Sequence, residues 1–413
     1  MHRWLALAWV LGLAACASAT SAGADAKQVN AAPPVLPGID VLLRDSLHLV
    51  RARRVGLVTN QTGVDARGVG DIERLRAAGV HLVALFSPEH GFRGAADAGA
   101  AVASTVDSAT GLPIYSLYGR VTSPTVEMLQ GVDLLLVDLQ DAGARYYTYI
   151  GTTIDVMAAA GRRGMPVVVL DRPDPIGGGV QGNVLDTAFA STVGRLAVPM
   201  RHGLTLGELA RLARADLRLA TDLTVIPVAG WRRALAWDET GLPFIPPSPS
   251  LRSVEALFHY PGLCLFEGTA LSVGRGTDAA FEQIGAPWLD TTAVLARARN
   301  AHLPGVSFAA VRFKPSRPAD GRFDDTLVAG IRLHVTDRRT YDPTRTSVEL
   351  LAAVQAVHPN RIGWIPRHFD RLASGPALRE ALMAGRKPDE IVKGWGSAIR
   401  AYEARRRPYL LYR

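Results

Sequence analysis

Acidic, basic and amide side chains follow an apolar run in the middle of the chain. Residues 132–137 are apolar except for Asp133, as in a parallel strand that is buried on both faces. The polar and aromatic side chains that come after this run include Asp138, Gln140, Asp141, Arg145 and Tyr147. Ligands of open α/β sheets bind beyond the carboxyl ends of the strands, so this strand end is the first candidate for a site. The alternative is that the aspartates only cap the next helix or pair with the arginine.

The same succession of apolar strand and polar cluster occurs at three other places. The polar side chains are Asn60 after residues 54–59, Glu89, His90 and Arg93 after residues 81–86, and Asp171 and Arg172 after residues 167–170. Right-handed βαβ connections bring the carboxyl ends of parallel strands to one edge of a sheet. We therefore expect the four clusters to meet there, which favours a site over four separate helix caps.

Carboxylates dominate this candidate site, and no activated serine or cysteine is recognisable. Paired carboxyl groups suit glycoside hydrolysis, because one protonates the leaving group while a second group assists the attack. His90, His202 and the aspartates are an alternative set of metal ligands, but none of their spacings is that of a strong zinc motif. We expect no metal and no cofactor.

Residues 177–182 satisfy the pattern G-x-G-x-x-G of dinucleotide-binding proteins. Two prolines separate them from the preceding strand, and no clear helix follows. The context disfavours a nucleotide site, because the pattern works only between a strand and the start of a helix.

A second group of charged residues lies in a glycine-rich segment after residue 260. It contains Glu267, Arg275 and Thr277. So many glycines around charged residues indicate backbone held close to a ligand. A region of β-turns with salt-bridged surface charges explains the spacing equally well.

Strands and helices alternate in the first half of the chain, which is typical of a parallel sheet. We expect strands at residues 54–59, 81–86, 114–118, 132–137, 167–170 and 223–226, and helices at 71–78, 124–130, 150–160 and 206–214. The second half should contain strands at 306–313 and 328–336 and helices at 347–357 and 388–403. The predicted fold class is α/β: a Rossmann-like doubly wound domain at residues 38–235, then a smaller α+β C-terminal domain at 236–413, with the active-site cleft between them.

The first residues predict export. Residues 1–16 combine Arg3, a short apolar stretch and Leu13-Ala14-Ala15-Cys16, which resembles the lipobox of a bacterial lipoprotein. We expect a periplasmic protein with lipid on Cys16, and cleavage within residues 17–26 without lipidation is the alternative. Residues 17–37, rich in Ala, Ser, Gly and Pro, should form a flexible tether. The membrane is thus expected as a partner only through the lipid anchor.

The formal net charge of +8 raises the question of nucleic acid binding. The basic residues are scattered, with no dense run apart from residues 405–407. Export and the absence of a basic stripe both argue against a nucleic-acid partner. Cys264, the only cysteine besides Cys16, lies in an apolar stretch and is expected to be a small core residue.

Several long segments resemble the NamZ-type exo-β-N-acetylmuramidases, a family of peptidoglycan hydrolases formerly known as a domain of unknown function. These segments are 56–64 (GLVTNQTGV), 85–94 (LFSPEHGFRG), 137–150 (VDLQDAGARYYTYI), 170–178 (LDRPDPIGG), 247–251 (PSPSL) and 260–277 (YPGLCLFEGTALSVGRGT). The resemblance implies release of N-acetylmuramic acid (MurNAc) from the non-reducing ends of peptidoglycan fragments such as MurNAc-GlcNAc and muropeptides. It implies no metal and no nucleotide.

The resemblance also suggests roles for the candidate residues. Glu89 would be the general acid, with Asp138 or Asp141 as the like-charged neighbour that keeps it protonated and Glu267 as a second candidate. Arg145 or Arg275 would bind the lactyl carboxylate of MurNAc through a bidentate contact. The other expected substrate-binding residues are Asn60, His90, Arg93, Gln140, Tyr147, Asp171, Arg172, His202 and Thr277. The competing interpretations are a non-catalytic muropeptide-binding lipoprotein and a cell-wall ester or amide hydrolase.

Overall fold

The computed structural model describes residues 33–413. The predicted signal peptide, the lipidation of Cys16 and most of the predicted tether lie outside the described residues. No helix within residues 33–413 is both long and apolar enough to cross a membrane.

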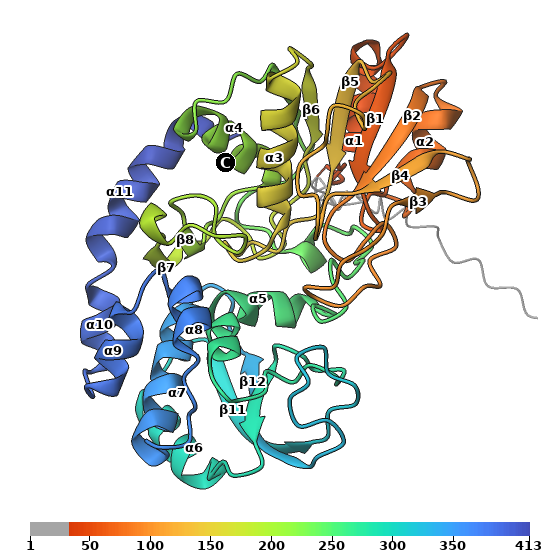
Figure 1. The fold of residues 1–413 in the computed structure, drawn as a ribbon. Coiled ribbons are helices and arrows are strands. Elements are labelled where there is room, and N and C mark those ends of the chain that lie inside the picture. Colours follow the sequence, from red (N-terminus) through yellow and green to blue (C-terminus); the bar gives the residue numbers. More distant parts are fainter. Residues whose placement is uncertain (1–32) are drawn as a thin grey trace, which may run out of the picture. The chain divides into compact units, whose positions relative to one another are not determined.

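The first half of the chain forms a sheet of seven strands, shown in Figure 1. Their order is β3 (Thr105–Val106), β4 (Pro113–Ser116), β2 (His81–Ser87), β1 (Arg54–Thr59), β5 (Leu134–Asp138), β6 (Val167–Leu170) and β9 (Leu223–Ile226). Every pair is parallel except β3 with β4. The chain winds in one direction from β1 to β4 and in the other from β5 to β9, so the expected doubly wound arrangement is confirmed.

Helices cover both faces of this sheet, and β5 shows why. Leu134 and Leu136 point to one face, where they share a core with α1 (Gly38–Asp45) and α2 (Asp71–Ala77). Leu135 and Val137 point to the other face, which α3 (Tyr149–Gly161) and α4 (Leu206–Asp216) cover. The alternation of side chains along a strand therefore turns one unbroken apolar run into two cores.

The second half of the chain contains a smaller antiparallel sheet. Its order is β10 (Gln283–Ala286), β12 (Val328–Val335) and β11 (Val306–Phe313). The helices α5 (Val254–Leu263), α6 (Thr291–Asn300) and α7 (Pro343–Val357) pack on or beside it. The helices that follow are α8 (Pro366–Ala373), α9 (Ala377–Met383), α10 (Pro388–Lys393) and α11 (Gly396–Arg406). This region confirms the predicted fold class.

The end of the chain returns to the first half. Helix α11 packs beside β7 (Gln181–Val184), which pairs with β8 (Pro199–Arg201) in a two-stranded sheet. Beyond α11, the hydroxyl of Tyr412 donates to Asp171 Oδ2 at 2.5 Å and accepts from the backbone N–H of Val228 at 2.9 Å. The last residues are thus hydrogen-bonded to the strand ends of the large sheet.

Three of the predicted helices differ from the structure. Residues 124–130 form turns, because only Pro124 and Leu129 are buried and so short a segment gains too little from packing to stabilise a helix. The helix predicted at 388–403 is two helices, α10 and α11, separated at Gly394 and Trp395. Helix α7 begins at Pro343, four residues before the predicted start, with Asp342 as its N-cap.

Candidate active site

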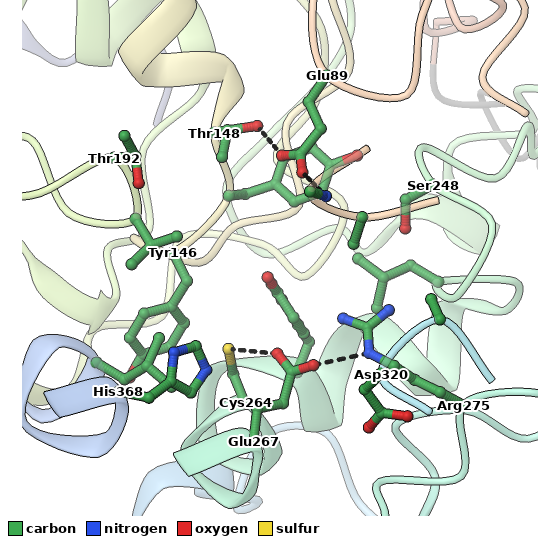
Figure 2. Close-up of a pocket in the computed structure, with 18 of the residues that line it drawn as sticks. Glu89, Tyr146, Thr148, Thr192, Ser248, Cys264, Glu267, Arg275, Asp320 and His368 are labelled. Carbon is green, nitrogen blue, oxygen red and sulfur yellow. Dashed lines mark hydrogen bonds and ion pairs between the residues drawn. The ribbon is translucent and has the colours of Figure 1, made fainter. Parts of the chain in front are cut away.

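A cavity of about 440 Å³ lies beyond the carboxyl ends of β2 and β5. Its upper wall in Figure 2 carries Glu89 and Thr148 from the loops after these strands. Its lower wall belongs to the second half of the chain and carries Glu267 and His368. The carboxyl groups of Glu89 and Glu267 point towards one another from these two walls.

Glu89 is positioned by a tight loop after β2. His90 and Gly91 both have positive φ values, of 70° and 75°, which turn the chain back immediately after the glutamate. His90 closes the turn through its Nδ1, which lies 2.8 Å from the carbonyl oxygen of Ala96. The glutamate side chain is thereby held on a short, constrained segment.

Both carboxylate oxygens of Glu89 accept hydrogen bonds. The backbone N–H of Gly99 donates to Oε1 at 2.8 Å, and the hydroxyl of Thr148 donates to Oε2 at 2.7 Å. Glu89 is 7% exposed and lines the cavity, so its orientation is fixed while it remains accessible to a ligand. Tyr118 lines the same part of the cavity, and burial together with the charge of Glu89 raises the pKa of its phenol.

Glu267 lies on the 3₁₀ turn η4 (Cys264–Gly268), and Arg275 is its partner. The Nε of Arg275 donates to Glu267 Oε1 at 2.7 Å, and a second guanidinium nitrogen donates to Ser250 Oγ at 2.9 Å. Burial acts to raise the pKa of Glu267, but the charge and hydrogen bond of Arg275 outweigh it, so the net shift is downward. Glu267 is therefore ionised at neutral pH.

Cys264 lies at the bottom of the cavity, 3.5 Å from Glu267. It is a free, buried cysteine, as its apolar sequence context predicted. Burial, with the adjacent charge of Glu267, holds the pKa of the thiol well above its usual range. A thiol that stays protonated is a poor nucleophile, so its position gives no support to a cysteine-dependent mechanism.

Asp138 does not line the cavity. It forms a buried ion pair with Arg172, whose Nη2 donates to Asp138 Oδ2 at 2.9 Å, and Asp71 completes the cluster 3.9 Å from the guanidinium. Burial, and then the charge of Asp138, raise the pKa of Asp71 well above its usual range, so Asp71 is the protonated member of the pair. This cluster occupies the point between β1 and β5 where the winding of the sheet reverses.

Asp141 and Gln140 also lie outside the cavity. Asp141 Oδ2 accepts from the backbone N–H of Gly143 at 2.7 Å and lies 3.3 Å from His202 Nε2. Asp174 lies 3.9 Å from the other nitrogen of this histidine, and burial raises the pKa of Asp174 to about 7. Gln140 donates to the backbone oxygens of Asp141 and Pro173. The polar residues after β5 thus organise the backbone behind the cavity.

Arg145 is buried, and its guanidinium binds Asn183 and the backbone oxygen of Leu372. Asp171 accepts hydrogen bonds from Thr205, Gly207 and Tyr412. Asn60 donates to the hydroxyl of Tyr149 at 2.7 Å. Arg93 lies with Asn60 in a separate hollow, and Thr277 accepts from Gln283. None of these five lines the cavity.

Of the residues predicted from the sequence, five line the cavity: Glu89, His90, Tyr147, Glu267 and Arg275. The lining residues that the sequence did not predict include Tyr118, Arg322, His368 and Arg371. His368 and Arg371 lie on α8, more than ninety residues after Arg275, and no recognisable motif marks them in the sequence. Their only signal was a His-x-x-Arg spacing on a short helix, which many surface helices share.

Within residues 33–413, no three His, Cys, Asp or Glu side chains gather in a group suited to a metal ion. The cavity itself offers carboxylates, arginines, tyrosines and two histidines. Such a set can transfer protons and bind a polar, anionic ligand.

Comparisons with known proteins agree along almost the whole described chain. Residues 55–255 match the family model of the exo-β-N-acetylmuramidase NamZ N-terminal domain, and residues 258–412 match that of its C-terminal domain. The chain is 39% identical over 399 residues to the peptidoglycan β-N-acetylmuramidase NamZ of Bacillus subtilis (strain 168), which covers 96% of each chain.

Two crystal structures from Bacteroides fragilis NCTC 9343, both of DUF1343 family proteins, have the same fold. One is 33% identical with a TM-score of 0.84, and the other is 30% identical with a TM-score of 0.76. Each alignment covers 92% of this chain and 99% of the other. The arrangement of both halves of the chain is therefore shared with these structures.

Proposed function

The chain belongs to the NamZ family of exo-β-N-acetylmuramidases, and we propose that it is a glycoside hydrolase that releases MurNAc from the non-reducing ends of peptidoglycan fragments. Peptidoglycan-derived glycans are its substrates, since the relative from Bacillus subtilis is named as a peptidoglycan β-N-acetylmuramidase. MurNAc-GlcNAc is the smallest fragment that contains the glycosidic bond between MurNAc and the next sugar, and muropeptides are the larger candidate substrates.

The observation that carries the catalytic assignment is the pair of glutamates in one cavity. Glu89 and Glu267 come from different halves of the chain, and both have their carboxyl groups on the cavity surface. Hydrolysis of a glycosidic bond needs a proton donor to the leaving oxygen and a second group that assists attack at C1. These two side chains meet that need without any of the aspartates in the buried clusters.

The environments of the two glutamates support different roles. Glu267 is ionised because Arg275 is bound to it, so it is the group that assists the attacking water. Glu89 has no arginine partner within the described residues and is our candidate for the general acid. In this scheme Glu89 gives its proton to the glycosidic oxygen as the bond to C1 breaks. Water attacks C1 and supplies the hydroxyl group of the released MurNAc, and Glu267 accepts the proton that this water loses.

The direct test is an assay of sugar release. The soluble chain from residue 31 is incubated with MurNAc-GlcNAc and with a chromogenic β-MurNAc glycoside, with the corresponding β-GlcNAc glycoside as the control. We expect free MurNAc from the first two and no reaction of the control. Binding of an uncleaved disaccharide would contradict the proposal in favour of a muropeptide-binding protein, and activity that a chelator removes would favour a metal-dependent hydrolase.

A peptidoglycan hydrolase acts outside the cytoplasm or at the cell wall. We further propose that this chain is periplasmic and held at the membrane by lipid on Cys16, on the evidence of the lipobox-like residues 13–16. The Cys16→Ala variant should then lose membrane association in cell fractions. An unchanged distribution would contradict the anchor and leave the enzymatic proposal untouched.

A further inference from the structure

A muramidase must distinguish MurNAc from GlcNAc, and the only difference between the two sugars is the lactyl ether at C3. This lactyl group carries a carboxylate, so a cation that is free to bind it is the expected means of recognition. Which residue of the same cavity supplies that cation is a question that rests on the proposed function.

Two of the three arginines that line the cavity already have partners. Arg275 binds Glu267 and Ser250. Arg322 donates to the backbone oxygens of Leu271 and Glu267, at 2.7 Å each. Arg145, the other arginine predicted from the sequence to bind the lactyl group, lies outside the cavity, and both of its terminal nitrogens donate to backbone and amide oxygens. None of these three can turn to a carboxylate without giving up contacts that hold the fold.

Arg371, the third arginine on the cavity wall, is different. Its Nη2 donates to Nδ1 of His368 at 2.7 Å, and its Nε is buried with no hydrogen-bond partner among the described residues. Within residues 33–413 it forms no ion pair with a carboxylate. A buried donor without a partner costs free energy, and a bound anion would recover it. Arg371 is therefore prepared to bind a negatively charged group.

Helix α8 fixes the position of Arg371 before any ligand arrives. The carbonyl oxygen of the next residue, Leu372, accepts a hydrogen bond from Arg145 at 2.7 Å. The carbonyl oxygen of Ala373 accepts one from the side-chain amide of Asn183 at 2.6 Å. These contacts join the end of α8 to the first half of the chain. Arg145 is therefore a positioning residue for Arg371. The family resemblance had suggested that Arg145 itself binds the lactyl group.

His368 adds a constraint on the direction of the guanidinium. A guanidinium can only donate, so His368 Nδ1 must be the acceptor and the ring must be neutral. Burial, and then the charge of Arg371, lower the pKa of His368 below its usual value, which keeps the ring in this state at neutral pH. Because Nη2 of Arg371 donates to the histidine, the other N–H groups of this guanidinium remain for a ligand.

Arg371 also acts on the part of the cavity that contains Glu89. Tyr118 lies beside Glu89, and the phenol is affected by both charges after burial: Glu89 raises its pKa and Arg371 lowers it. Glu89 and Arg371 line the same cavity, so a sugar bound there can meet both the carboxyl group and the guanidinium.

We propose that Arg371, held in place by His368, binds the lactyl carboxylate of MurNAc and gives the cavity its specificity for muramic over glucosamine residues. The contact is a charge-assisted hydrogen bond.

The test compares two substrates and two enzymes. The substrates are a chromogenic β-MurNAc glycoside and the same compound with the lactyl carboxylate converted to its uncharged methyl amide. The enzymes are the wild type and Arg371→Met, which keeps an unbranched apolar side chain and removes the charge. We expect Arg371→Met to lose about 30- to 300-fold in kcat/KM on the carboxylate and less than about threefold on the amide.

Two controls separate this effect from a loss of folding. Arg367→Met removes an exposed arginine from the same helix and should leave both rates unchanged. Arg371→Lys keeps a charge without the planar fork, so its loss on the carboxylate should fall between those of the wild type and Arg371→Met. Wild-type enzyme alone provides a test without any variant, because free MurNAc should inhibit far better than its lactyl amide.

Equal losses of Arg371→Met on both substrates, or no loss on either, would overturn the proposal. If the wild type fails to cleave the β-MurNAc glycoside at all, the proposed function itself is wrong. If the wild type cleaves it and does not distinguish the carboxylate from the amide, the function stands and only the role of Arg371 is refuted.

Discussion

Glu89 and Glu267 share a cavity but differ in what surrounds them. Glu89 receives two neutral donors, a backbone N–H and a threonine hydroxyl. Glu267 receives the guanidinium of Arg275, which keeps it charged despite its burial. Pairs of carboxyl groups in different electrostatic environments are how glycosidases divide acid and base roles between chemically similar side chains.

The Arg275→Met variant tests this division through the pH profile. Without the arginine, burial becomes the largest influence on Glu267 and raises its pKa above its present, lowered value. Because the ionised form assists attack, the acidic limb of kcat/KM should move to higher pH. The measurement is a pH series on the chromogenic glycoside, with thermal unfolding as a check on folding.

Arg252→Met is the matched control for this prediction. Arg252 is exposed and pairs at 3.0 Å with Asp278, whose side chain is also exposed. The same substitution there should leave the pH profile where it is, since surface ion pairs contribute little. An acidic limb that stays in place in Arg275→Met would mean that Glu267 does not act in its ionised form.

At the level of single residues, the sequence predicts which strand ends carry polar groups but not where these groups point. Glu89 reaches the cavity because the backbone reverses at His90 and Gly91. Asp138 ends β5 and points to Arg172 behind the cavity instead. Both look alike as acidic residues after an apolar strand. Only the tertiary structure tells a ligand-facing carboxylate from one that neutralises a buried arginine.

Helix α8 is the element on which the specificity of the cavity depends, and Gly268 allows it to pack closely. A Cβ at position 268 would lie 2.5 Å from the Cα of Phe369, in the middle of α8. The backbone N–H of Ile365 also donates to the oxygen of Gly268 at 2.8 Å. The turn that carries Glu267 and the helix that carries Arg371 are therefore held in direct backbone contact.

The Gly268→Ala variant should separate these two elements. Backbone cannot yield as a flexible side chain does, so α8 must shift, and we expect a loss of about 1–3 kcal/mol in the free energy of unfolding. The shift should also raise KM, because Arg371 moves with the helix. Urea unfolding and steady-state kinetics measure the two effects.

Gly70→Ala is the control, because nothing lies within 4 Å of a Cβ at that position and its φ of −64° suits alanine. It should change stability by less than about 0.5 kcal/mol. A Gly268→Ala variant as stable and as active as this control would show that the close packing of α8 is not required.

The elements were predictable where one periodicity dominates a segment. The parallel strands of the large sheet and helix α3 match their predicted positions closely, because each is a continuous apolar or periodic run, whereas the two-residue strand β3 was not predicted. Helix α8 was not predicted at all. It has eight residues, and only Phe369, Leu372 and Ala373 are buried, so its stability comes from contacts with distant parts of the chain.

At the scale of the whole molecule, the C-terminal residues connect the second half of the chain to the first through hydrogen bonds. Tyr412 links Asp171, at the end of β6, to the backbone of Val228 after β9, and the N–H of Leu411 donates to Glu208 at 2.7 Å. Glu208 in turn completes the capping box of α4. The second half of the chain is thereby hydrogen-bonded to the sheet at a distance from the cavity, which keeps the two cavity walls in register.

The Tyr412→Phe variant should weaken this connection. It leaves Asp171 without one donor and the N–H of Val228 without its acceptor, both in a buried environment. We expect a loss of about 2 kcal/mol in the free energy of unfolding by urea titration. Tyr409→Phe, which removes a hydroxyl that has no hydrogen-bond partner among the described residues, should have little effect. Equal stability of the two variants would contradict this role of the C-terminal residues.

If Glu89 is the general acid, the effect of its removal must depend on how much the leaving group needs a proton. Glu89→Gln is assayed on MurNAc-GlcNAc, whose sugar leaving group needs a proton, and on a 2,4-dinitrophenyl β-MurNAc glycoside, whose leaving group does not. We predict a loss of about 10³-fold or more on the disaccharide and less than about tenfold on the aryl glycoside. Glu73→Gln, at an exposed position on α2, should lose nothing on either. Equal losses on both substrates, or full activity on the disaccharide, would contradict the account.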